Sequence, residues 1–109
     1  MRRALSAALV TWLAAAPALA FDGTYGETCV PDGDNVPITI EGDRIFFYES
    51  QCRLTNPVTV RDMEGAVLFD MACEGEGEVW IDRAFLQPGW EGGLIFVSRG
   101  FARMLPRCD

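Results

Sequence analysis

The chain has 109 residues and no histidine, and its 16 acidic and nine basic side chains give a formal net charge of −7 at pH 7. Without histidine, the commonest general base and the Ser-His-Asp and Cys-His catalytic sets are excluded. All nine basic residues are arginine, so lysine Schiff-base chemistry and a P-loop are excluded too. An acidic chain with scattered arginines also disfavours binding to nucleic acid or an anionic membrane surface.

Residues 1–20 have the features of a secretory signal peptide. Arg2 and Arg3 supply positive charge, residues 5–16 are almost wholly apolar, and Ala18-Leu19-Ala20 places small residues at alternate positions, as a cleavage site requires. The apolar segment is shorter than the roughly 20 residues that a membrane-spanning helix needs. The pattern therefore predicts export, with an uncleaved N-terminal anchor as the alternative.

Cleavage after Ala20 would leave residues 21–109 as a single mature domain of 89 residues that begins at Phe21. Its net charge would be −9, because the leader holds two arginines and no acidic residue. We expect a soluble periplasmic or secreted product. A chain of this length has a core only marginally sufficient for stability, so covalent cross-links should matter.

Four cysteines, Cys29, Cys52, Cys73 and Cys108, lie in the expected mature domain. An even number in a short exported chain predicts two disulfides. A zinc site fits less well, because there is no histidine and the cysteines do not form close Cys-x-x-Cys pairs.

After the leader, turn residues recur every few positions and helical periodicity is absent, which predicts many short strands. Glycine-containing segments separate most of them and predict hairpins. The expected strands are residues 36–40, 44–49, 58–62, 66–72, 78–85, 94–98 and 101–106.

The side-chain pattern differs among these strands. Residues 66–72 and 78–85 alternate in polarity, as half-buried antiparallel strands do. Residues 45–48 and 94–97 are apolar at every position, so we expect these strands to be covered on both faces. An all-β antiparallel meander that closes into a small barrel fits best, because closure removes free edges, and a two-sheet β-sandwich is the alternative.

The meander constrains which cysteines can meet. Successive strands alternate in direction, so Cys52, after the second expected strand, and Cys73, after the fourth, lie at the same end, and Cys108 lies at the other. This predicts the pairs Cys52–Cys73 and Cys29–Cys108. Strands two positions apart are about 10 Å from each other, so we expect Cys52 and Cys73 to join overhanging ends.

Two acidic segments are candidate cation sites. Asp32, Asp34 and Asn35 have the alternate oxygen spacing of a calcium loop, but they lack its downstream glutamate and equally suit a turn. Residues 74–78 alternate glutamate and glycine, which also suits a solvated hairpin tip. We expect neither a metal nor another cofactor.

Trp90 is the candidate binding residue. It lies among glycines and a proline on the longest connection between the late strands, and aromatic residues on such loops often anchor partners. The alternative is that Trp90 folds back to plug one end of the barrel. Trp80, inside an expected strand, should be packed.

The run of residues 49–58, together with residues 73–77 and the terminal Arg107-Cys108, resembles a group of small secreted bacterial proteins with paired cysteines and no assigned activity. The resemblance implies export and disulfide pairing. The expected architecture is also similar to that of periplasmic lysozyme inhibitors, although no inhibitor motif is present.

These observations favour a non-enzymatic periplasmic module that binds or inhibits a basic or envelope protein. The alternative is a weakly acting enzyme or a divalent-metal binder, for which only carboxylates remain. Carboxylate catalysis needs a substrate cleft that a domain of this size rarely provides.

Overall fold

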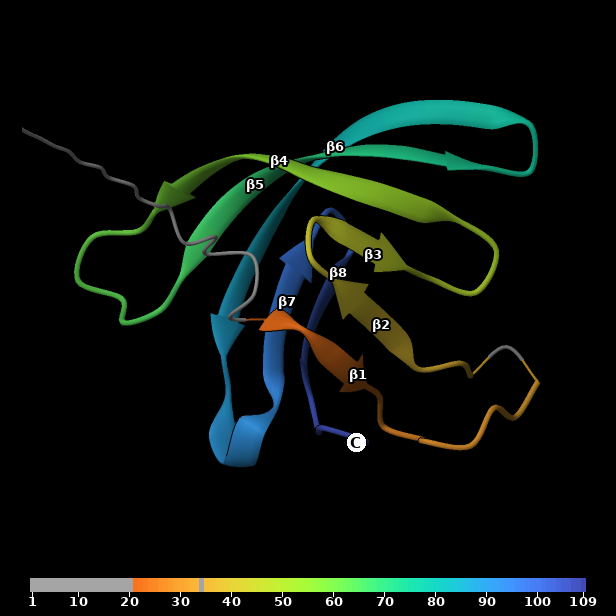
Figure 1. The fold of residues 1–109 in the computed structure, drawn as a ribbon, viewed down its shortest axis with the longest axis horizontal. Coiled ribbons are helices and arrows are strands. Elements are labelled where there is room, and N and C mark those ends of the chain that lie inside the picture. The colour runs from red at the N-terminus through yellow and green to blue at the C-terminus, as the bar shows by residue number, and fades with distance from the viewer. Residues whose placement is uncertain (1–20, 34) are drawn as a thin grey trace, which may run out of the picture.

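The computed structural model describes residues 21–33 and 35–109, so the expected signal peptide at residues 1–20 and Asp34 lie outside the described part. The described residues form one eight-stranded antiparallel sheet in sequence order, folded into a nearly closed barrel (Figure 1). The expected meander is confirmed, and the two-sheet alternative is wrong. The strands are β1 (Gly23–Tyr25), β2 (Ile38–Glu41), β3 (Arg44–Phe46), β4 (Gln51–Thr59), β5 (Val67–Gly75), β6 (Glu78–Pro88), β7 (Leu94–Ser98) and β8 (Phe101–Leu105).

The largest difference from the expected strands is β4, which begins at Gln51 rather than at residue 58. Asn56 and Pro57 suggest a turn, but they form an irregularity within the strand, with Asn56 at φ 52°. Pairing to β5 resumes beyond them at Val58, opposite Leu68. The expected strand therefore starts too late because a bulge and a turn favour the same residue types.

The barrel interior is filled by alternate residues of the strands, as the period of two requires. Ile45, Leu86 and Leu94 have no exposed surface, and the Phe69 ring meets the Phe21 ring edge-on at 6.3 Å. The rest of this core is Tyr25, Ile38, Ile40, Cys52, Leu54, Val67, Met71, Cys73, Ala84, Phe96 and Leu105.

The two predicted disulfides are both present, but one has a different setting from that expected. Cys52 and Cys73 lie directly opposite each other within β4 and β5, which are neighbouring strands. The expected bridge between overhanging ends of separated strands is wrong. Cys52 lies inside β4, which pairs directly with β5, and not in a loop between two strands.

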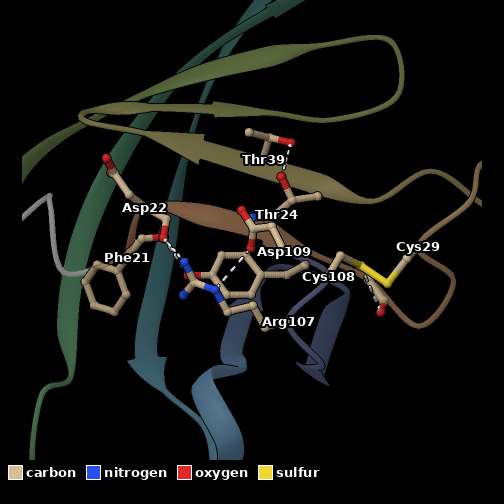
Figure 2. A network of polar contacts seen from close by, with 10 residues as sticks. Phe21, Asp22, Thr24, Cys29, Thr39, Arg107, Cys108 and Asp109 are labelled. Carbon is tan, nitrogen blue, oxygen red and sulfur yellow. Dashed lines mark hydrogen bonds and ion pairs between the residues drawn. A yellow bond between two sulfur atoms is a disulfide. The ribbon is translucent and has the colours of Figure 1, made fainter.

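The barrel closes where β1 meets the chain after β8. Gly26 N–H donates to the Pro106 carbonyl at 3.0 Å, and Cys108 N–H donates to the Thr24 carbonyl at 2.7 Å. Figure 2 shows the side chains around this seam, including Arg107, which donates to the Asp22 carbonyl at 3.0 Å. The Cys29–Cys108 disulfide cross-links the seam, which joins the first and last strands.

Tyr25 makes the seam sensitive to alkaline pH. Burial raises the pKa of Tyr25, an effect that Arg107 opposes and that the carboxylates of Asp109 and Asp22 reinforce. Its hydroxyl donates to the Phe21 carbonyl at 2.7 Å, a bond that only the neutral phenol can make. Because the folded state favours the neutral form, the stabilisation is complete below about pH 10 and is lost as pH rises through the raised pKa.

We expect Tyr25→Phe to cost about 1 kcal/mol at neutral pH, where the hydrogen bond is lost, and to flatten the alkaline decline in stability. Urea unfolding midpoints of both proteins, measured from neutral to strongly alkaline pH, check this. Midpoints that fall in parallel for the two proteins as pH rises would contradict the role of Tyr25.

Candidate functional site

Trp90 projects from the connection between β6 and β7 and is 83% exposed. The segment forms a single tight turn with positive φ at Glu91 and Gly92, in which Gly93 N–H donates to the Trp90 carbonyl at 2.8 Å. Gly89 N–H donates to the Gly93 carbonyl, also at 2.8 Å, and closes the loop at its base. Trp90 therefore stands on a backbone held by hydrogen bonds, and the alternative that it plugs the barrel is wrong.

A row of apolar residues crosses the outer face of the sheet near this loop. The strand registers align Val58 with Leu68, then Phe85, Val97 and Ala102, one from each strand from β4 to β8. The chain neighbours of Leu68 and Phe85 are buried in the core, so Leu68 and Phe85 point outward, and residues paired across strands share one face of the sheet. Val58 and Val97 are exposed, and Leu68 and Phe85 are half-buried.

The apolar surface continues from this row towards the Trp90 loop. Ile95 of β7 pairs with Met104 of β8 on the same outer face, and Met104 is exposed. A Cβ placed on Gly89 would lie 3.0 Å from the Met104 sulfur, so the loop base packs directly on Met104. We call the row of five residues together with Ile95, Met104 and Trp90 the outer apolar surface.

The expectation that residues 94–97 are covered on both faces is therefore wrong. The described residues form one sheet, and none of them makes a second layer over β7. Exposed apolar patches of this kind mark interaction surfaces. The sequence showed the unusual apolar run but not that its outer side chains, Ile95 and Val97, are in part exposed to solvent.

A separate cleft of about 350 Å³ opens at the barrel mouth. The Phe96 ring lies 5.9 Å from Phe47 and 5.5 Å from Phe101, and the Arg103 guanidinium lies 5.3 Å from the Phe101 centroid. Arg103 also pairs with Glu27 at 3.5 Å. The rings pack on one another and the one cationic group of the lining is paired, so the cleft is a weaker candidate than the outer apolar surface.

The candidate cation sites are turns in the described residues. Asp32 and Asn35 exchange backbone hydrogen bonds of 2.9 and 3.0 Å, and Asp34 lies outside the described part. Residues 76–77 form the tip of the β5–β6 hairpin. Within residues 21–33 and 35–109, no group of three potential metal-binding side chains is found.

Trp80 lies on β6 and is 39% exposed, so the expectation that it is packed is wrong. Cys73, which pairs with Trp80 on β5, is buried, but β6 extends beyond the end of β7 at this point. Among the described strands, none pairs with the far side of β6 to cover Trp80.

The fold and surface define a disulfide-bonded β-barrel domain with a bare apolar face. No protein-family model, curated protein or solved structure matches the chain. In the described part, no helix has the length and apolar character needed to cross a membrane. The similarity to small secreted proteins with paired cysteines stays a prediction.

Proposed function

We propose that this chain is an exported, non-catalytic module that binds a basic protein of the cell envelope through Trp90 and the outer apolar surface. The proposal is carried by one observation: Trp90 is 83% exposed beside an apolar face that the described chain leaves uncovered. Binding energy at protein interfaces concentrates in a few residues, among which tryptophan is enriched.

The geometry of the loop supports an anchoring role. Glu91 and Gly92 have φ values of 54° and 81°, so the chain reverses tightly directly after Trp90, whose side chain is left exposed. Because the loop is closed by backbone hydrogen bonds, little backbone conformational entropy remains to be lost when a partner covers Trp90.

Charge supports the choice of a basic partner. The expected mature domain carries a net charge of −9, which would speed its encounter with a cationic protein and repel anionic surfaces. The lack of histidine and lysine supports a binding role rather than a catalytic one.

Two features support export. The two disulfides persist in oxidising compartments such as the periplasm. The composition of residues 1–20 is that of a signal peptide. Protein recovered from the periplasmic fraction should begin at Phe21, and a Met1 N-terminus in the membrane fraction would contradict this part of the proposal.

The test begins with the immobilised domain, which is used to capture partners from periplasmic extract. We expect Trp90→Ala to weaken binding of the captured protein by about 2 kcal/mol, or roughly 30-fold, in a calorimetric titration. The thermal midpoint should change little, because Trp90 is almost fully exposed.

Tyr48→Ala is the matched control, since Tyr48 is an exposed aromatic residue outside the outer apolar surface. Its affinity should equal that of the wild type. Equal affinities for wild type and Trp90→Ala would overturn the assignment of Trp90 as the anchor.

A further inference from the structure

The first half of β6 is a free sheet edge. β5 pairs with β6 from residue 78 onward, but β7 pairs with β6 only from Ala84 to Pro88. Within residues 21–33 and 35–109, the segment 78–83 therefore has a neighbouring strand on one side alone. In Figure 1 the β5–β6 hairpin extends away from β7 and β8 at this end. We call residues 78–83 the free edge.

The backbone of the free edge has unused hydrogen-bonding groups. Arg83 N–H donates to the carboxylate of Asp82 at 3.2 Å rather than to a strand, which places it on the unpaired side. Backbone groups of alternate residues point to the same side of a strand, so those of Val79 and Ile81 point there too. Among the described residues, no other segment bonds to this side.

The free edge has exposed apolar side chains on both faces. Val79 is 80% exposed and Ile81 is 69% exposed on the outer face, while Trp80 is 39% exposed on the inner face. An exposed apolar edge is a template for pairing with another strand, and proteins normally avoid one or protect it. Its presence here indicates a site for strand addition.

Acidic residues surround the free edge and determine what can add to it. Glu74, Glu76 and Glu78 make no ion pair within the described residues, and Asp82 has only Arg99, at 3.8 Å. A second copy paired antiparallel with Trp80 opposite Trp80 would place Glu78 opposite Asp82 twice. Like charges directly opposite each other destabilise a sheet, so self-pairing in this register is disfavoured and a strand with basic residues opposite Glu78 and Asp82 is favoured.

We propose that the free edge binds an extended basic segment of a partner protein as an added antiparallel strand. This rests on the proposed protein-binding function but uses a separate surface, because the Asp70–Arg83 ion pair of 3.1 Å lies between Ile81 and the outer row. The added strand would carry basic residues opposite Glu78 and Asp82. Between them it would carry three apolar residues, opposite Val79, Trp80 and Ile81.

The probe is a capped synthetic peptide containing Arg-Val-Tyr-Val-Arg, and the control peptide has glutamate in place of both arginines. We expect only the basic peptide to bind, with amide chemical-shift changes concentrated in the free edge and with affinity that falls as salt rises. Ile81→Pro removes an N–H on the unpaired side and should weaken binding at least about ten-fold.

Glu78→Arg keeps the backbone intact and gives each peptide one attractive and one repulsive charge pair, so both peptides should bind with similar affinity. Retained binding without a preference cannot come from misfolding. Trp90→Ala should leave peptide binding unchanged, so failure of the proposed Trp90 anchor and failure of the free-edge site are distinguishable.

Three results would overturn the proposal. The first is that neither peptide binds, and the second is that binding is unchanged in both Ile81→Pro and Glu78→Arg. The third is a concentration-dependent dimer that Ile81→Pro abolishes, which would assign the free edge to a second copy of the chain.

Discussion

Removal of the Cys29–Cys108 disulfide, by Cys29→Ser with Cys108→Ser, should lower the free energy of unfolding by about 4.5 kcal/mol. The bridge spans 79 residues, and longer closed loops restrict the unfolded chain more. A loss of this size approaches the whole stability of a small domain, which is about 5–15 kcal/mol. Urea unfolding of the variant and the wild type under oxidising conditions measures the difference.

The second disulfide is the natural control. Cys52 and Cys73 span 21 residues and lie inside a ladder that already pairs β4 with β5 over most of its length. Their joint replacement by alanine should cost about 3 kcal/mol. Hydrogen exchange should separate the two variants, because only the first should expose the amides of Gly26 and Cys108 at the seam.

The position of each bridge explains this contrast. The seam is held by two backbone hydrogen bonds and the contacts of Arg107, whereas β4 and β5 are joined along nine-residue strands. Equal loss of protection at the seam in both variants would show that Cys29–Cys108 does not hold the barrel closed.

The all-β meander was predictable because its signals are local. Glycine-containing turns and period-two alternation act over a few residues, and they indicated seven of the eight strands. The three-residue β1 was missed because it is too short to show alternation. The start of β4 was missed because Asn56 and Pro57 suit a bulge as well as a turn, although Cys52 and Leu54 already alternate as inward residues.

The candidate site was only partly predictable. The loop of Trp90 could be recognised from its proline and glycines. The outer row could not, because it depends on the register of five strands and on the bulge that sets Val58 opposite Leu68. The free edge follows from the unequal lengths of β6, with 11 residues, and β7, with five, which only the pairing reveals.

Phe69→Ala should lower the free energy of unfolding by about 3–5 kcal/mol, because Phe69 is buried in the barrel and its removal leaves a cavity. Its ring contacts Phe21 edge-on, and the small Ala84 opposite it on β6 gives the ring room. The surrounding strands are fixed by pairing on both sides, so the cavity cannot collapse fully. Urea unfolding midpoints measure the loss.

Leu68→Ala is the matched control, since Leu68 precedes Phe69 on β5 but faces outward in the outer apolar surface. It should cost less than about 1.5 kcal/mol of stability, because the side chain lies on the outer face, is partly exposed to solvent, and leaves no closed cavity when it is removed. Leu68→Ala should instead lower the affinity for the partner that Trp90 binds. If Leu68→Ala destabilises the domain as much as Phe69→Ala does, Leu68 belongs to the structural core. The outer apolar surface would then not be available to bind a partner together with Trp90.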